Sequence, residues 1–236
     1  MKSPNVSFSK GQDLLLDWFK THARQFPWRN TRDPFKVLVA EKLLQQTAAN
    51  AHVVKAYTAL VEEFPTAKAL GEASLEVVQE IVAPLGLKYR AEELVKMARE
   101  LQGKHGGEVP SDLTDILRLT GVGQYCGRAV LCFAMQRDIP VVDTNIARFI
   151  KRYVGLTEVL PANPARSKKF LSLQAQLIPE GDSREYQLAI LDLCASTCRP
   201  RNPRCSECPV REECSHGTSK NSAPLSTSVS IRTNLS

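Results

Sequence analysis

The chain has 236 residues, of which 43% are hydrophobic, a share typical of a globular protein with one domain or two small lobes. Its first twenty residues contain no long uncharged apolar run, which argues against a secretory signal or a membrane anchor. The formal net charge of +6 favours a polyanionic partner, because each neutralised phosphate releases condensed counterions.

Apolar residues recur at helical spacing along most of the chain, and no alternation typical of a β-hairpin or a βαβ unit is present. Proline and glycine interrupt these runs, as at Phe26-Pro27, Phe64-Pro65 and Gly106-Gly107. We therefore predict an all-α protein of about ten short helices. The expected helical runs lie within residues 14–19, 37–48, 53–61, 94–101, 113–119, 125–135 and 146–153.

The helices are expected to form two lobes. Residues 25–154 are predicted to make a central helical lobe, and residues 1–24 are predicted to join residues 155–216 in a second lobe. Residues 217–236 are rich in serine and threonine and have no apolar period, so a disordered tail is expected there.

A glycine-containing turn lies between two expected helices, at about residues 113–136. Its sequence is Leu119-Thr120-Gly121-Val122-Gly123, and the second helix begins directly after it. Backbone N–H groups exposed in such a turn, together with a helix N-terminus, can hold a phosphate. The candidate contacts are Gly121, Val122, Gly123 and Gln124, and a plain helix connector is the alternative.

Two acidic residues are candidates for chemistry. Asp143 follows the apolar pair Val141-Val142 and precedes a helix, so it is either the N-cap of that helix or a carboxylate directed toward whatever the hairpin holds. Glu41 lies on or beside the apolar stripe of its own helix. Burial there raises the pKa of a carboxyl and makes it a candidate general acid, whereas a salt-bridged glutamate at the core edge is the alternative.

Four cysteines near the C-terminal end are spaced C-x6-C-x2-C-x5-C, at Cys198, Cys205, Cys208 and Cys214. This grouping indicates one metal or iron-sulfur site. The spacing matches neither the ferredoxin patterns nor a pair of C-x2-C zinc knuckles, and a zinc site stays the alternative. The remaining three cysteines are expected to be buried thiols, because a reducing compartment disfavours disulfides: Cys126, Cys132 and Cys194.

Together these motifs resemble those of the helix-hairpin-helix DNA glycosylases of the endonuclease III superfamily, which carry a C-terminal 4Fe-4S cluster. The resemblance covers about Asp13 to Cys214. It rests on the order and separation of Phe26-Pro27-Trp28-Arg29, Asp33-Pro34, Glu41 to Thr47, the hairpin, Val142-Asp143 and the cysteines. It implies a two-lobed fold, a 4Fe-4S cluster, mismatched double-stranded DNA as partner, and a monomer in the cytoplasm of a prokaryote, associated with the nucleoid.

The resemblance also implies roles for individual residues. Asp143 corresponds to the catalytic aspartate, which stabilises the oxocarbenium-like sugar and positions water as the N-glycosidic bond breaks. Gln46 corresponds to a residue that enters the gap left when the target nucleotide is flipped out. The four cysteines correspond to the cluster ligands, and the cluster is expected to pin a basic loop against the DNA backbone. The basic residues of that loop are Arg199, Arg201 and Arg204.

Tyr125 stands where bifunctional members have a lysine that forms a Schiff base with the sugar. The implied enzyme is therefore a monofunctional glycosylase that leaves an abasic site, with Tyr125 stacked on or hydrogen-bonded to the flipped base. In the hairpin, Thr120 replaces a proline that is common in the family, which costs the turn some rigidity but keeps both glycines.

Several features favour thymine and uracil opposite guanine over adenine as the target. Leu188, ten residues before the first cluster cysteine, stands where adenine enzymes tend to place a hydrogen-bonding Gln or Glu. Ala49 replaces a larger valine, and residues 87–92 lack the paired tyrosines of those enzymes. Only 22 residues follow Cys214, where adenine enzymes continue into a further domain. All these features resemble the archaeal-type thymine-DNA mismatch glycosylases.

Other assignments stay open. Trp28 and Arg29 either line the base pocket or anchor their loop, and Glu41 either protonates the leaving base or positions base or water. One alternative function is an adenine glycosylase that acts on A opposite G or 8-oxoguanine without the extra domain. Another is a non-catalytic DNA-binding or redox-sensing iron-sulfur protein, against which Asp143 argues because phosphate binding needs no acid.

Overall fold

The computed structural model describes residues 9–86 and 89–219, and every regular element within these ranges is helical. The described residues form twelve α-helices and four short 3-10 helices, so the predicted all-α class is confirmed. Within the same ranges, no helix combines the length and the apolar character that crossing a membrane requires.

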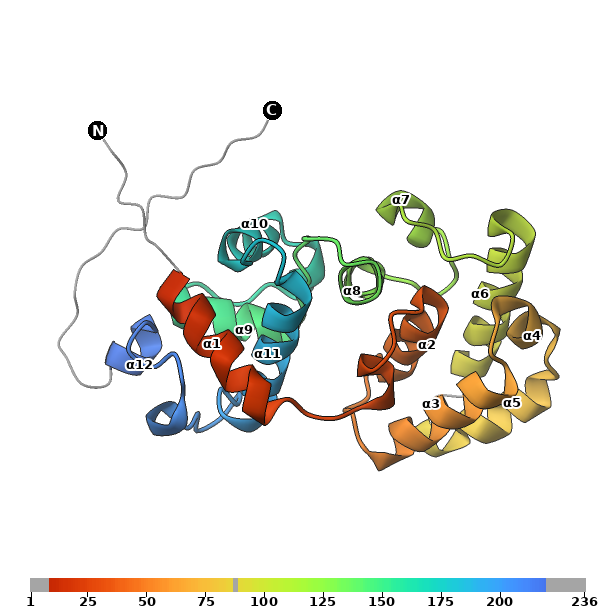
Figure 1. Cartoon of the computed structure of the whole chain (residues 1–236), viewed down its shortest axis with the longest axis horizontal. Helices are drawn as coiled ribbons and strands as arrows, with labels where there is room; N and C mark the ends of the chain where they lie inside the picture. Colours follow the sequence, from red (N-terminus) through yellow and green to blue (C-terminus); the bar gives the residue numbers. More distant parts are fainter. Residues whose placement is uncertain (1–8, 87–88, 220–236) are drawn as a thin grey trace.

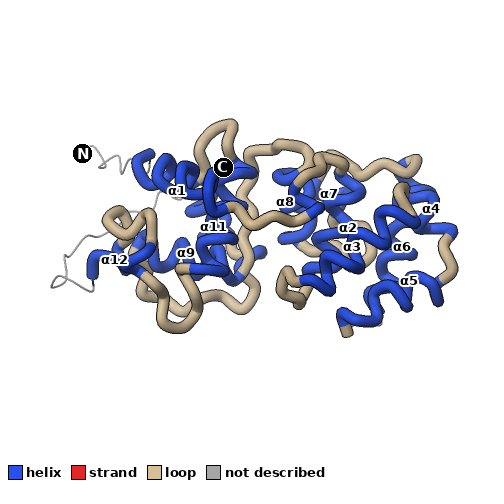
Figure 2. Tube along the Cα trace, turned by 60° about the horizontal axis from the view of Figure 1, so that its bottom comes forward, coloured by secondary structure: helices blue, strands red, loops and turns tan. Residues whose placement is uncertain are grey.

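The helices pack around two buried apolar cores. The helices of the two cores lie toward opposite ends of the elongated molecule in Figures 1 and 2. Leu38, Leu60 and Leu94 are representative of the first core. Its elements are η1 (Pro27–Arg29), α2 (Pro34–Leu44), α3 (Ala51–Glu63), α4 (Ala67–Glu72), α5 (Leu75–Val82), η2 (Ala83–Leu85), α6 (Tyr89–His105), α7 (Leu113–Ile116) and α8 (Gln124–Phe133).

The second core brings the N-terminal helix together with the C-terminal third of the described chain. Leu15 of the first helix and Ile190 of α11 are both fully buried in this core. The surrounding elements are α1 (Ser9–His22), α9 (Thr144–Val154), η3 (Pro164–Arg166), α10 (Lys168–Leu177), α11 (Ser183–Ser196), η4 (Cys205–Glu207) and α12 (Ser215–Ser219).

Helix α9 differs from the expected division of the chain. The sequence predicts that residues up to 154 belong to the central lobe, yet Ile146 and Ile150 are buried in the second core. The change occurs between two adjacent residues, because Val141 packs in the first core and Val142 in the second. An apolar period alone does not tell which core a helix joins. We therefore propose that the lobes divide at Val141–Val142.

Local sequence explains where the helices that carry the site begin. Asp33 is the N-cap of α2 and accepts hydrogen bonds from the backbone N–H groups of Phe35 and Lys36, while Pro34 occupies the first turn, where a missing N–H is harmless. Helix α9 begins with the N-cap Asp143 and ends before Gly155, whose φ of 77° is readily adopted only by glycine.

Polar side chains of α11 join the lobes. Gln187 accepts from the backbone N–H of Val141 at 2.6 Å and donates to the carbonyl of Ile139 at 3.1 Å. Arg184 donates to the carbonyl of Phe133 at 3.0 Å and to that of Arg29 at 2.7 Å. These bonds fix the second lobe against the ends of α8 and η1, which border the site.

The prediction that a disordered tail begins at residue 217 is wrong, because α12 continues through residue 219 and Gly217 is buried in it. Residues 220–236 lie outside the described residues. Leu87 and Lys88, two of the positions compared with the paired tyrosines, also lie outside them.

Candidate active site and cysteine centre

A cavity of about 430 Å³ opens between the lobes and is lined by residues of α2, α8 and α11 and of the start of α9. Its volume is within the usual range for ligand pockets. The three predicted catalytic residues, Asp143, Glu41 and Tyr125, all line this cavity. The predicted pocket residues and the predicted wedge residue line it as well: Trp28, Arg29, Ala49, Leu188 and Gln46.

Asp143 is the N-cap of α9, which was one of the two interpretations of this residue, and it also lines the cavity. Its Oδ1 accepts from the backbone N–H of Ile146 at 2.7 Å, and its Oδ2 accepts from the side-chain amide of Asn145 at 2.7 Å. The carboxylate is half-buried. Two fixed donors hold its orientation, which suits a group that must face a cationic sugar in one geometry.

The bonds of Asp143 continue toward the cysteines. Asn145 Oδ1 accepts from Arg148 at 3.0 Å, and Arg148 Nε donates to the carbonyl of Cys198 at 3.1 Å. A single path of hydrogen bonds therefore connects the cavity acid with the first cysteine of the cluster motif. Neither Asn145 nor Arg148 is among the residues predicted from the sequence, although both lie within the first turns of the helix that Asp143 caps.

Glu41 is 6% exposed, and its Oε2 has no hydrogen-bond partner. Burial, reinforced by the nearby charge of Asp143, raises the pKa of Glu41 to about 8, although Arg29 opposes this shift. No ion pair of Glu41 is present in the described part of the chain, so the salt-bridge alternative is wrong. Glu41 is therefore a neutral acid near pH 7, able to donate a proton or a hydrogen bond.

Tyr125 is the second residue of α8 and faces both acids. Burial first, and then the charges of Glu41 and Asp143, raise the pKa of this phenol well above 10. It therefore remains a neutral hydrogen-bond donor with an aromatic face. Such a group can contact a base, but it offers no amine for a Schiff base.

Arg29 and Trp28 line the cavity and also anchor their loop. Arg29 makes a bidentate pair with Asp192, with distances of 2.7 and 2.8 Å, and Arg24 binds the same carboxylate at 2.6 Å. Trp28 stacks on Phe26 with a centroid distance of 4.8 Å. Asp192 is 1% exposed; burial alone raises the pKa of its carboxyl, but the hydrogen bonds from Arg29 and Arg24 outweigh burial and lower it.

Neither Asp192 nor Arg24 is among the residues predicted from the sequence, although a signal is present. Asp192 interrupts the apolar run of α11, just as Glu41 lies on the apolar stripe of α2. A charged residue inside such a run is rarely left unpaired. Which of the arginines binds it depends on the tertiary fold.

The loop between α2 and α3 holds Gln46 in a strained conformation. Its φ of 56° lies in the left-handed region, which costs energy for any residue other than glycine. Arg90, only 2% exposed, donates to the carbonyl of Gln45 at 2.6 Å and to the Thr47 hydroxyl at 3.2 Å. The surrounding contacts thus hold the residue on both sides, as expected for a side chain that must point in a fixed direction.

The hairpin residues lie beside the cavity rather than in its wall. Gly121 and Gly123 are exposed, whereas Val122 is 7% exposed and packs in the core. The Val122 N–H is bonded to the carbonyl of Leu119 at 3.1 Å. Helix α8 begins at Gln124, and no side chain caps its N-terminus. Backbone groups at Gly123 and Gln124 thus fit the predicted phosphate contact, while Val122 anchors the turn.

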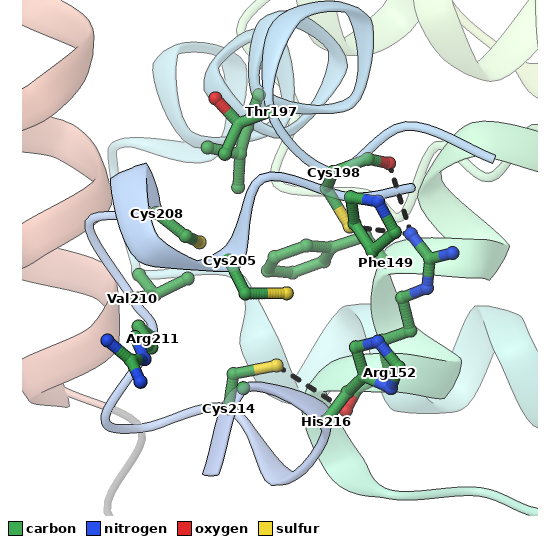
Figure 3. Close-up of a pocket in the computed structure, with 13 residues that line it drawn as sticks. Phe149, Arg152, Thr197, Cys198, Cys205, Cys208, Val210, Arg211, Cys214 and His216 are labelled. Carbon is green, nitrogen blue, oxygen red and sulfur yellow. Dashed lines mark hydrogen bonds between the residues drawn. The ribbon is translucent and has the colours of Figure 1, made fainter. Parts of the chain in front are cut away.

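The four clustered cysteines line one small cavity near the C-terminal end of the second lobe, beside Phe149. Figure 3 shows the thiols around a common space, with Arg152 of α9 reaching across its rim. Arg152 donates to the Cys198 sulfur at 3.3 Å and to the carbonyl of Arg199 at 2.7 Å. The three other cysteines, Cys126, Cys132 and Cys194, are buried thiols, as predicted.

The donor set, four cysteine sulfurs that line one cavity, fits an iron-sulfur cluster, because such clusters are held by cysteine thiolates. A hydrogen bond from Cys194, aided by Arg152, lowers the pKa of Cys198 to about 6, which favours the thiolate that iron binds. Burial raises the pKa of Cys208 to about 12, so ligation must displace its proton.

Two family models match the chain. Residues 39–173 match the model described as HhH-GPD superfamily base excision DNA repair protein. Residues 198–214 match the iron-sulfur binding domain of endonuclease III, and this range begins and ends at the first and last of the four cysteines.

Several DNA glycosylases are similar in sequence to most of this chain. A thymine-DNA glycosylase of Aeropyrum pernix is 32% identical over 85% of this chain and 91% of its own length. A thymine/uracil-DNA glycosylase of Methanothermobacter thermautotrophicus is 35% identical over 86% and 90%. An adenine DNA glycosylase of Mycolicibacterium smegmatis is 35% identical over 83% of this chain and 66% of its own length.

A solved structure agrees with this similarity. The structure of a thermostable thymine-DNA glycosylase superposes with a TM-score of 0.84 at 33% identity, covering 92% of this chain and 99% of that one. The two-lobed helical arrangement is therefore shared, and Asp143, Glu41 and Tyr125 lie between the lobes of that arrangement.

Proposed function

Because this chain belongs to the HhH-GPD superfamily of base excision DNA repair proteins, we propose that it is a monofunctional DNA glycosylase. It excises thymine and uracil opposite guanine and so starts base excision repair. Its C-terminal loop is an iron-sulfur binding domain of the endonuclease III type. DNA is the macromolecule on which the enzyme acts.

One observation carries this proposal: Asp143, Glu41 and Tyr125 line a single cavity between the lobes. The target bond is unreachable inside a stacked duplex, so the nucleotide must be flipped into the cavity. The fixed carboxylate of Asp143 then stabilises positive charge on the sugar as the bond breaks, and it accepts a proton from the attacking water. Tyr125 provides no amine, so the product is an abasic site.

The walls of the cavity support thymine or uracil as the target. Leu188 lines it and is 5% exposed, and Ala49 lines it as well. Neither side chain has a donor or acceptor for adenine, and discrimination by enzymes depends strongly on such hydrogen bonds. The thymine and uracil relatives point in the same direction. Glu41, neutral near pH 7, can donate a hydrogen bond to a base carbonyl that gains negative charge on departure.

A second candidate function is excision of adenine opposite G or 8-oxoguanine. The raised pKa of Glu41 favours it, because adenine departs more easily when a ring nitrogen is protonated and a neutral carboxyl can supply that proton. The similarity to adenine glycosylases also supports it. The apolar Leu188 wall argues against it.

Cys198, Cys205, Cys208 and Cys214 are the residues that would hold a 4Fe-4S cluster. We propose that it links the end of α11 to α12 and shapes the basic loop with Arg199, Arg201 and Arg204. The cluster supplies a rigid covalent junction and no open coordination site for hydrolysis. We further propose that the protein acts as a monomer in the cytoplasm of a prokaryote, at the nucleoid.

A panel of end-labelled duplexes tests the function. Duplexes with T·G, U·G, A·G and A·8-oxoguanine are incubated with the protein and then treated with alkali. Cleavage of T·G and U·G after alkali is expected, with none before alkali. Cleavage of only the adenine duplexes would replace the proposal by its alternative, and strand cleavage without alkali would contradict the monofunctional assignment.

A further inference from the structure

The hairpin forms a tight turn whose two ends are buried. The Val122 N–H donates to the carbonyl of Leu119 at 3.1 Å, and both side chains are less than 8% exposed. Gly121, third in the turn, has φ of 70°, and Thr120, second in the turn, has no positive φ. This is the pattern of a type II turn, in which proline is favoured at the second position because its ring presets φ. Here that position is Thr120.

Glu100 of α6 makes up for the missing ring. Its Oε2 accepts the backbone N–H of Thr120 at 2.7 Å, and its Oε1 accepts the Thr120 hydroxyl at 2.8 Å. One carboxylate therefore binds both donors that proline would lack. Hydrogen bonds to an ionised acceptor are stronger than neutral ones, so the contact restrains the turn tip in two directions.

A second carboxylate of the same helix holds the next residue. Glu93 lies seven residues before Glu100, so both project from one face of α6. It pairs at 2.6 Å with Lys42, which is fully buried and donates to the carbonyl of Gly121 at 2.9 Å. Gln45 donates to the same carbonyl at 2.9 Å. Helix α6 thus fixes two consecutive residues at the tip of the hairpin. Glu100 binds Thr120 directly, and Glu93 holds Gly121 through Lys42.

We propose that Glu100 is a positioning residue for DNA-backbone binding, because its two bonds to Thr120 hold the hairpin turn in the conformation that meets the phosphate. The proposal rests on the DNA-glycosylase function proposed above. Electrostatics alone predicts the opposite effect of removing Glu100, since losing a negative charge beside a phosphate site strengthens DNA binding. Whether DNA binding becomes weaker or tighter when Glu100 is removed therefore distinguishes a positioning role from a purely electrostatic effect.

Glu100→Met removes both acceptor oxygens and keeps the length of the side chain. We expect about tenfold weaker binding of a duplex that contains an abasic-site analogue, measured by fluorescence anisotropy. The slope of log Kd against log salt should become shallower, because one phosphate contact is lost. The single-turnover excision rate at saturating enzyme should stay within about twofold, since the cavity acids are untouched. Glu92→Met is the control, because it removes an exposed charge from the same helix.

Thr120→Pro is the rescue variant. Proline presets the turn and has no N–H, so both Thr120→Pro and the double variant Thr120→Pro/Glu100→Met should bind like the wild type. Wild-type or tighter binding by Glu100→Met would overturn the proposal. Equal weakening of the single and double variants would overturn it too, because Glu100 would then act through something other than Thr120.

Milder variants keep the test decisive if Glu100→Met fails to fold. Glu100→Gln keeps one acceptor oxygen, and Thr120→Val removes only the hydroxyl. Each variant should weaken DNA binding by a smaller factor than Glu100→Met. Unchanged DNA affinity in both variants would refute the role of Glu100. The proposed function fails separately: a wild-type protein that excises no base, yet binds DNA in a Glu100-dependent manner, would refute the catalytic assignment alone.

Discussion

The side-chain amide of Asn145 donates to Oδ2 of Asp143 at 2.7 Å, and no other side chain among the described residues binds this carboxylate. Asn145→Leu keeps the size of the side chain and removes the donor. A hydrogen bond to a charged group contributes on the order of 1.5 to 3 kcal/mol, so we expect a single-turnover excision rate lower by about tenfold or more. An unchanged rate would show that the cap bond to Ile146 suffices to orient Asp143.

The pH dependence of stability tests the protonation of Glu41. The pKa of this carboxyl is raised to about 8 by burial and by Asp143, from 4.5 for an ordinary glutamate. At pH values between 4.5 and about 8, the folded protein retains a proton on Glu41 that the unfolded chain has released. Stability therefore falls by about 1.4 kcal/mol per pH unit as pH rises through this window, by on the order of 5 kcal/mol in total.

Glu41→Gln removes that dependence. Relative to the wild type, its free energy of unfolding should increase steadily between pH 5 and pH 8, as measured by urea denaturation at several pH values. The titration of all other groups is common to both proteins and cancels in the comparison. Parallel pH profiles of the two proteins would mean that Glu41 is ionised in the folded state.

Replacing the phenol at position 125 tests the monofunctional assignment. Tyr125 lines the same cavity as Asp143. We therefore expect an amine placed there to reach the sugar of a flipped nucleotide. We expect Tyr125→Lys to form a covalent complex with abasic DNA that borohydride traps, whereas the wild type forms none. Trapping of the wild-type protein would show that another amine of the chain reaches the sugar.

The two hairpin glycines should differ in their tolerance of a methyl group. Gly121 has φ of 70°, and a Cβ there would collide with Lys42 Nζ and the Glu93 carboxylate. Gly123 has extended backbone, and its Cβ would meet no atom within 4 Å. Gly121→Ala should lower the free energy of unfolding by about 1 to 3 kcal/mol, and Gly123→Ala by less than about 0.5 kcal/mol. Equal losses in thermal unfolding would contradict this account of the turn.

The fold class and the set of candidate residues followed from sequence, because helical apolar periods and fixed motif spacing are local properties. Glu41 illustrates this: its place on an apolar stripe predicted the burial that the structure contains. The cysteine spacing likewise identified residues that line one cavity. Their catalytic and binding roles remain predictions.

The sequence did not predict the contacts between segments that lie far apart along the chain. Arg90 and Gln46 are separated by 44 positions in sequence, so nothing local indicates that a buried guanidinium restrains the strained loop. The pairing of Glu100 with Thr120 was hidden for the same reason, and the turn was expected to lose rigidity that the carboxylate restores. The predicted lobe of α9 differs from the observed one, because the spacing of its apolar residues does not indicate which of the two cores they join.

The most direct measurement is the release of free base from a T·G duplex under single-turnover conditions, detected by mass spectrometry. The wild-type protein should release free thymine, and leave an abasic site that only alkali cleaves. Asp143→Asn keeps the cap and the size of the side chain, so it should bind the same duplex with similar affinity and release thymine at least a hundredfold more slowly, on the order of the loss seen when a transition-state electrostatic group is removed. Thymine release by Asp143→Asn at the wild-type rate, or no release by a wild-type protein that binds the duplex, would contradict the account.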